Sequence, residues 1–224
     1  PGSFNVGEAW TNTSTVVKYV EDDGLDICFD FDLASNIIWA VNGGNTLGLR
    51  GQINNVVQTY PDQRWGTFLT NHDINRIFDQ LGRDEEKNKA ALSILMTLPG
   101  VPFIYYGEEV GMRGEKPDEN IRRPMSWSGA ANVGFTTGIP WHPPAVNHTT
   151  HNLATQQVDP QSLFHHYRKM IHLRGETQVL RTGEYLEANC PGANLIGFWR
   201  YSATDTVLVV VNCSNASTIN APID

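Results

Sequence analysis

The sequence has few cysteines, little positive charge and no long hydrophobic run. Its 16 Lys and Arg face 24 Asp and Glu, and the net charge of −8 argues against a nucleic-acid or anionic-membrane partner, since both need a basic face. No apolar run approaches the roughly 18 residues of a membrane span. The three cysteines, Cys28, Cys190 and Cys213, are widely spaced and predict neither a disulfide framework nor a zinc cluster.

Motifs for common cofactors are also missing. The sequence contains no GxGxxG and no P-loop, so no nucleotide cofactor is expected. Its seven histidines show no HExxH spacing, which argues against a catalytic zinc site. We therefore assign no metal ligand and expect no cofactor in this chain.

The 224 residues are enough for one large domain or slightly more, and 40% of them are hydrophobic. Short apolar segments that favour strands alternate with segments that favour helices. This alternation is typical of βαβ units and predicts an α/β fold with a buried parallel sheet. The expected strands are 3–7, 26–31, 65–70 and 101–106, and the expected helices are 13–21, 33–58 (interrupted by glycines) and 84–98.

The second half of the sequence has a different pattern. Residues 107–158 are irregular, and their aromatic side chains (Trp127, Phe135, Trp141) indicate an ordered functional loop. A helix is expected over 160–174. Three strands without intervening helices then predict an antiparallel β domain, at 183–188, 195–201 and 206–212. We place the domain boundary between 1–177 and 178–224.

Carboxylates follow each of the four expected parallel strands. They are Glu8, the pair Asp30 and Asp32, Asp73, and the pair Glu108 and Glu109. Active sites of parallel α/β folds lie at the carboxyl ends of the strands, and acids there suit acid/base or oxocarbenium chemistry. From pattern alone, each acid is also compatible with a helix cap or a loop residue.

Neighbouring residues have two interpretations as well. His72 is compatible with a sugar-binding residue or with a hydrogen-bonded structural histidine. Four aromatic residues near strand ends could belong to the core or could stack on sugar rings: Trp10, Tyr105, Tyr106 and Trp127.

Several stretches together resemble the α-amylase family, glycoside hydrolase family 13. They occur in the family's order and span roughly residues 3–224: FNVGEAW, FLTNHD, LPGVPFIYYGEEVGM, IRRPMSW, GFTTGIPW and DPQSLFHHYRKMIHLR. The later stretches are most similar to the branch that holds α-glucosidases, oligo-1,6-glucosidases, trehalose synthases and some bacterial amylases.

The resemblance implies a role for each residue of the predicted site. Glu8 would be the general acid/base, and Asp73 the carboxylate that stabilises the transition state. Asn71 and His72 would bind the sugar, with Trp10 beside them. Arg76 would orient neighbouring groups by ion pairing, with a surface salt bridge as the alternative.

The resemblance also implies the second half, strands five to eight, of a (β/α)8 TIM barrel, followed by part of an antiparallel β domain. No segment upstream of Glu8 matches the family's aspartate nucleophile. We therefore expect a fragment that is inactive alone, with the N-terminal half-barrel or a second copy of itself as partner. Family members often bind calcium, mostly through a domain without a counterpart here.

The expected function is retaining hydrolysis of α-glucosidic bonds in starch or maltooligosaccharides. A transglycosylase or trehalose synthase-type enzyme would use the same acids and differ in water access. A non-catalytic sugar-binding relative is the third alternative, although the presence of Glu8, His72 and Asp73 argues against it.

Overall fold

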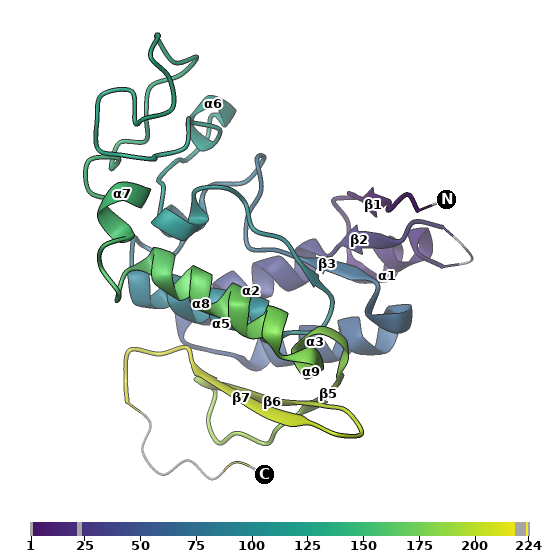
Figure 1. Cartoon of the computed structure of the whole chain (residues 1–224). Helices are drawn as coiled ribbons and strands as arrows, with labels where there is room; N and C mark the ends of the chain where they lie inside the picture. Colours follow the sequence, from purple (N-terminus) through teal and green to yellow (C-terminus); the bar gives the residue numbers. More distant parts are fainter. Residues whose placement is uncertain (1, 22–23, 218–222, 224) are drawn as a thin grey trace.

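The first half of the chain builds a parallel sheet (Figure 1). The computed structural model describes residues 2–21, 24–217 and 223. Four parallel strands are hydrogen-bonded in the order in which they occur along the sequence, which confirms the predicted parallel arrangement. They are β1 (Val6–Gly7), β2 (Ile27–Phe29), β3 (Trp65–Thr67) and β4 (Val101–Pro102).

The hydrogen-bonded strands are shorter than the apolar runs that predicted them. The run 65–70 contributes only its first three residues to the ladder, although Phe68, Leu69 and Thr70 are buried. Residues beyond the ladder still pack in the interior, so apolar patterning overstates the length of a strand. Strand β3 ends at Thr67, so the residues that follow it are not paired in the sheet. They are available to form a site beyond the end of the strand.

Helices connect the parallel strands. The stretch 33–58 forms two helices, because Gly44 has a left-handed φ of 66° and ends the first, whereas Gly48 and Gly51 lie inside the second. In chain order the connecting elements are α1 (Thr13–Val16), η1 (Val17–Tyr19), α2 (Phe31–Gly43), α3 (Leu47–Thr59), η2 (Pro61–Gln63), α4 (Ile77–Gln80) and α5 (Glu85–Thr97).

The segment 107–158 after β4 is irregular, as the sequence predicted. It contains three short elements, η3 (Glu108–Val110), α6 (Asp118–Ile121) and α7 (Leu153–Gln156). The predicted helix over 160–174 is α8 (Leu163–Glu176), which begins where Ser162 caps it, and α9 (Gln178–Thr182) follows.

The last part of the chain forms the expected antiparallel sheet. Its strands β5 (Glu184–Glu187), β6 (Leu195–Tyr201) and β7 (Thr206–Asn212) pair in sequence order. Residues of β6 lie in the same buried cluster as residues of the helices that flank the parallel sheet. The core is therefore continuous across the proposed boundary between 1–177 and 178–224, which stays a prediction.

The main core takes side chains from α2, α3, α5 and α8 and from both sheets. Helices α5 and α8 lie side by side, with the antiparallel sheet against them (Figure 1). None of the helices in the described residues is long and apolar enough to cross a lipid bilayer.

Candidate active site

Glu8 stands directly after β1, at the sheet edge where the sequence predicted a site. Its exposed carboxylate accepts hydrogen bonds on Oε1 from Trp10 Nε1 (3.2 Å) and Asn71 Nδ2 (3.3 Å). The backbone of β1 lies close to β2, because a Cβ on Gly7 would lie only 2.5 Å from Cys28 Sγ. Glycine at this position therefore allows β1 to pack closely against β2, and this packing positions the backbone of Glu8.

Asn71 connects the ends of two strands. Its Nδ2 donates to Glu8, 63 positions earlier in the chain, and its Oδ1 accepts the backbone N–H of Asp73 at 2.9 Å. The second bond is an Asx turn, a local geometry that asparagine favours. One amide side chain thus places both carboxylates, and Glu8, Asn71, His72 and Asp73 lie together as the sequence motif suggested.

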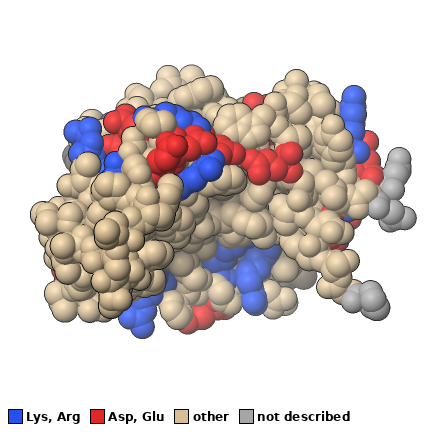
Figure 2. All heavy atoms as spheres, turned by 90° about the horizontal axis from the view of Figure 1, so that it is seen from above, with Lys and Arg blue, Asp and Glu red and all other residues tan. Residues whose placement is uncertain are grey.

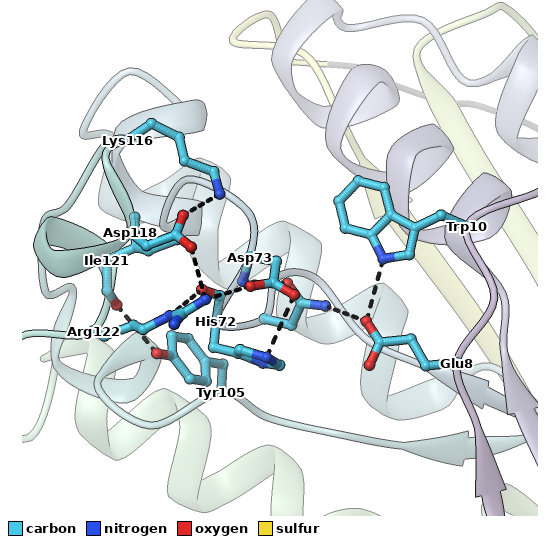
Figure 3. A network of polar contacts seen from close by, with 10 residues as sticks. Glu8, Trp10, His72, Asp73, Tyr105, Lys116, Asp118, Ile121 and Arg122 are labelled. Carbon is cyan, nitrogen blue, oxygen red and sulfur yellow. Dashed lines mark hydrogen bonds and ion pairs between the residues drawn. The ribbon is translucent and has the colours of Figure 1, made fainter.

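The carboxylate of Asp73 is held from the opposite side by the loop after β4 (Figure 3). Arg122 donates to Asp73 Oδ1 at 2.5 Å, to the carbonyl of His72 at 2.9 Å and to Asp118 Oδ2 at 2.9 Å. Lys116 completes the network by pairing with Asp118. His72 Nε2 lies 3.4 Å from Asp73 Oδ2, so both oxygens of this carboxylate have a basic neighbour.

A cavity of about 190 Å³ opens between these groups. Its walls are aromatic, with Phe29 packed edge-on against Phe68 and Phe103 at centroid distances of 5.2 and 4.7 Å. The polar side chains that line it come from Glu8, Thr70, Asn71 and His72. The lining residues are Glu8, Phe29, Phe68, Thr70, Asn71, His72, Phe103, Ile104 and Tyr105. An apolar cavity with few convergent polar groups is the usual form of a small-molecule site.

The aromatic residues near the strand ends have different environments. Trp10 is 62% exposed and packs on Phe31 at 4.6 Å, so the core alternative is wrong for this residue. Trp127 is also exposed, in the loop after β4. Tyr105 lines the cavity, and its hydroxyl donates to the carbonyl of Ile121 at 3.1 Å.

Arg76 is fully buried, which contradicts the alternative of a surface salt bridge. Its guanidinium lies over the rings of Tyr105 and Tyr106, at 4.7 and 4.8 Å, and donates to the Tyr106 carbonyl at 2.6 Å. Among the described residues Arg76 itself forms no ion pair, so the expected ion pairing is wrong, and its contacts are the two tyrosine rings and the carbonyl. Its orienting role stays a prediction. Arg76 supports the cavity wall from behind and does not line it.

The acids after β2 have structural roles. Asp30 is buried and caps α2, accepting the N–H of Leu33 at 2.8 Å and the hydroxyls of Thr13 at 2.8 Å and Tyr60 at 3.2 Å. Burial raises the pKa of this carboxyl, although these hydrogen bonds oppose the shift. Asp32 accepts the backbone N–H of Thr13 at 3.1 Å. The helix-cap interpretation is therefore correct for Asp30.

Glu108, after β4, is an internal acid. It is fully buried, and its carboxylate accepts a hydrogen bond from the Thr70 hydroxyl. Burial raises its pKa to about 8, while Thr70 and Arg76 oppose that shift. Burial also raises the pKa of Glu109, which accepts the N–H of Gly107 at 2.7 Å. Of the acids after the four strands, Glu8 lines the cavity, and Asp73 directly follows His72, which also lines it.

Sequence reasoning gave no role to Arg122, although it lies in the IRRPMSW motif. Its contact with Asp73 joins two segments 49 positions apart, and local patterning does not reveal such a contact. The sequence signal that could have indicated a role for Arg122 was the basic pair Arg122–Arg123, which precedes a long stretch without Lys or Arg. On the face seen from above, acidic and basic side chains gather side by side (Figure 2).

The described residues contain no group of three or more His, Cys, Asp or Glu side chains that could hold a metal ion. All three cysteines are free and buried. Burial raises the pKa of each thiol, to about 11 for Cys213.

The site combines a glutamate and an aspartate at the carboxyl edge of parallel strands with an aromatic cavity. This combination is typical of α/β enzymes that use their own carboxylate side chains to act on sugars. Comparison with known sequences specifies the family. Residues 1–183 match the family described as "Alpha amylase, catalytic domain", and the chain belongs to this family. The resemblance found in the sequence motifs is thereby confirmed.

The relatives are about twice as long as this chain. Alpha-amylase 3 of Dictyoglomus thermophilum is 31% identical over 218 residues, which cover 95% of this chain and 43% of the relative. The crystal structure of an alpha-amylase from H. orenii is 38% identical with a TM-score of 0.87, covering 95% of this chain and 44% of that one. A trehalulose synthase mutant is 26% identical with a TM-score of 0.78, covering 94% and 47%.

These comparisons also place the fold. The structural neighbours are α-amylase-type TIM-barrel proteins, and this chain covers a portion of them. A parallel sheet followed by an antiparallel one is compatible with such a portion.

Proposed function

We propose that this chain provides half of the active site of a retaining hydrolase that cleaves α-glucosidic bonds in starch or maltooligosaccharides. The observation that carries the proposal is the Asn71 bridge, which links the carboxylate of Glu8, at the aromatic cavity, to the backbone N–H of Asp73. Membership of the α-amylase family supports the same class of reaction.

Glu8 is the general acid and base in this proposal. Its carboxyl protonates the glycosidic oxygen as the bond breaks, and its carboxylate then takes a proton from the attacking water. Asp73 binds sugar hydroxyls and favours the oxocarbenium-like transition state. Asn71 and His72 hold the ring from the cavity mouth, and the exposed face of Trp10 lies beside Glu8.

Retaining hydrolysis also needs a nucleophilic carboxylate on the other side of the sugar. We propose that it lies outside these 224 residues, in an N-terminal half-barrel or in a second copy of the chain. In support, the chain covers 44% of the H. orenii enzyme, and β1 and β4 are the outer strands of the described sheet. A closed eight-stranded barrel pairs each strand on both sides. Our four strands would be strands five to eight.

The proposal is tested by Glu8→Gln in two proteins, this chain and the complete protein with the proposed nucleophile. Reducing sugar released from maltoheptaose is the measurement. We expect no turnover by the chain alone, and a loss of at least about a hundredfold in kcat for the complete protein, in line with the loss of a general acid. The matched control is Glu21→Gln, an exposed glutamate away from the cavity, which should keep full activity.

Three results would contradict the proposal in different ways. Steady turnover by the isolated chain, abolished by Glu8→Gln, would show that no second half is needed. Unchanged turnover of the complete protein with Glu8→Gln would remove Glu8 from the mechanism. Binding of maltoheptaose without any turnover by the complete protein would favour a non-catalytic sugar-binding relative.

Transglycosylation is the second candidate, favoured by the similarity to a trehalulose synthase. The same carboxylates would transfer the glycosyl group to a sugar hydroxyl in place of water. Product analysis on maltose separates the two reactions, because hydrolysis gives glucose alone and transfer gives a new di- or trisaccharide.

A further inference from the structure

The loop after the Arg122–Arg123 pair has an unusual composition. Residues 124–158 contain no Asp, Glu, Lys or Arg, in a chain that is 18% charged. Three of its aromatic side chains are nevertheless about half exposed: Trp127 (47%), Phe135 (52%) and Trp141 (60%). Exposed aromatic rings that lie together on a surface are typical of an interaction site.

The loop projects at the upper left of Figure 1, and the corresponding side of the molecule in Figure 2 is a broad area without charged side chains. A surface without charge offers no electrostatic attraction to a charged partner. It is suited to a neutral ligand.

Internal hydrogen bonds give the loop a defined shape. The backbone N–H groups of Trp127 and Ser128 both donate to the carbonyl of Val133 at 3.0 Å. Val133 is buried and has a φ of 50°, a left-handed conformation that β-branched residues rarely adopt. Such a conformation persists only where its surroundings hold it. A Cβ on Gly134 would lie 3.3 Å from the Cβ of Trp127, so the Gly134–Phe135 segment packs against that tryptophan.

The loop is also attached to the candidate active site. Arg123 donates from one nitrogen to the carbonyls of Pro143 and Pro144, both at 2.8 Å. Its own carbonyl accepts the hydroxyl of Tyr106 at 2.7 Å. The preceding residue is Arg122, which holds the carboxylate of Asp73. The loop is therefore attached to Tyr106, whose ring contacts that of the cavity-lining Tyr105 at a centroid distance of 4.7 Å.

Trp141 lies beside this attachment. Its ring contacts that of His142 at a centroid distance of 5.4 Å, and His142 Nε2 is hydrogen-bonded to Asn120 Oδ1 at 3.1 Å. Asn120 belongs to α6, the helix that ends next to Arg122. The exposed indole of Trp141 thus lies near α6 and Arg122. It is accessible to a ligand that extends out of the cavity.

The size of the cavity indicates what such a ligand would be. At about 190 Å³ it is smaller than typical ligand pockets, which span roughly 300–1,000 Å³. A substrate of several sugar units must extend beyond it. Sugar rings carry no charge, and their C–H faces pack against aromatic rings while their hydroxyls bond to neutral polar groups. The loop offers both kinds of partner, including Asn132, Thr136 and His142.

We propose that the uncharged loop 124–158 is an accessory binding surface for an α-glucan chain extending from the Glu8–Asp73 cavity, with Trp141 and Phe135 as stacking platforms. The inference rests on the proposed function for the identity of the sugar. It adds a role in substrate length: the surface contacts a long oligosaccharide and leaves a disaccharide in the cavity untouched.

The test is calorimetric titration of the full chain with maltoheptaose and with maltose. We expect Trp141→Ala and Phe135→Ala each to weaken maltoheptaose binding about tenfold, the usual effect of truncating an aromatic anchor, and to leave maltose binding unchanged. Trp39→Ala is the matched control, because Trp39 is a similarly exposed tryptophan on α2, outside the loop. Far-UV circular dichroism checks that each variant is folded.

Each result has a separate meaning. Equal maltoheptaose affinity in the wild type, Trp141→Ala and Phe135→Ala would overturn the proposal, and so would no detectable binding of maltoheptaose. Self-association that Trp141→Ala abolishes, with sugar affinity unchanged, would identify the loop as a protein interface instead. The proposed function fails in a different experiment, if Glu8→Gln leaves the turnover of the complete protein unchanged. In that case the sugar binding measured for the loop would still stand.

Discussion

At the scale of single residues, burial separates the carboxylates that follow the parallel strands. Glu8 is exposed and hydrogen-bonded to two side-chain N–H groups at the cavity. Asp30 follows β2 and Glu108 follows β4, but both are buried, where desolvation favours their neutral forms. Acids at one sheet edge therefore have different roles: Asp30 caps a helix, and Glu108 packs behind the cavity.

Glu108 makes a prediction about pH. Its pKa of about 8 in the folded protein lies above the ordinary value of 4.5. At a pH between these two values, the folded state retains a proton on Glu108 that the unfolded state has lost. The stability that this proton contributes is complete below about pH 4.5 and is lost as the pH rises to about 8. Glu108→Gln cannot ionise, so its free energy of unfolding should rise relative to wild type across that range.

Urea denaturation between about pH 5 and about pH 8 measures this difference. The exposed Glu119→Gln is the control, and its difference from wild type should stay constant with pH. A constant difference for Glu108→Gln as well would mean that Glu108 is ionised in the folded protein.

The sequence motifs predicted which residues gather at the site, but not how each is held. Asn71, His72 and Asp73 are adjacent in sequence, so their proximity follows from local structure. The contact of Arg122 with Asp73 depends on how a long loop folds back over the sheet, which no local pattern encodes. Arg76 was expected to form an ion pair, at the site or on the surface, because a buried charge is usually paired. The two tyrosine rings that cover it belong to a different strand exit.

At the scale of elements, sequence signals worked best where a helix has its own end signal. The helix expected over 84–98 begins at Asp84, a residue type that favours the cap position, and its carboxylate accepts the N–H groups of Glu86 and Lys87 at the start of α5. The strands were predicted in the correct order but too long, because burial continues after ladder pairing stops. The glycine at position 44 divides the helical stretch 33–58, whereas glycines at other positions are tolerated inside α3.

Removing the cap of α5 should weaken the whole fold. Asp84→Ala leaves two N–H groups without their carboxylate, and the free energy of unfolding should fall by about 1 kcal/mol. Asp84→Asn, which keeps an accepting oxygen, is the control and should recover most of the loss. Thermal denaturation followed by circular dichroism measures both. Equal melting temperatures for Asp84→Ala and wild type would show that solvent replaces the cap without cost.

At the scale of the molecule, two buried arginines connect elements that are far apart in the sequence. Arg174 of α8 donates to the carbonyls of Met96, Leu98 and Gly100, at 2.7–2.9 Å. These carbonyls lie at the end of α5 and in the turn to β4. Arg200 of β6 donates to the carbonyl of Thr97 at 2.8 Å. Burial lowers the pKa of both arginines to about 10, which leaves them charged at neutral pH.

The contacts of Arg200 reach further into the connection between the sheets. It also donates to the carbonyls of Leu180, at 3.1 Å, and Gly183, at 2.7 Å, on either side of the end of α9. One side chain thus binds the end of α5, helix α9 and the start of β5. Three carbonyls from three segments share one charged donor.

Arg200→Met should therefore destabilise the whole molecule. It keeps much of the apolar stem but leaves buried carbonyls without a donor, and we expect a loss of about 3 kcal/mol or more in the free energy of unfolding. Urea denaturation measures the loss. Arg168→Met on the exposed face of α8 is the control and should stay within about 0.5 kcal/mol of wild type. Similar stability of the two variants would show that apolar packing alone joins the sheets.

The position of Arg200 has a consequence for how such proteins diversify. Its donors sit on the antiparallel sheet, and the Thr97 acceptor sits at the end of α5, the helix that leads into β4 of the parallel sheet. Recombination that exchanged the terminal sheet for one from a distant relative would separate the guanidinium from its acceptors. The two parts are therefore expected to be inherited together, and lineages of this protein should vary by changing the loop after β4 more readily than by shuffling its terminal module.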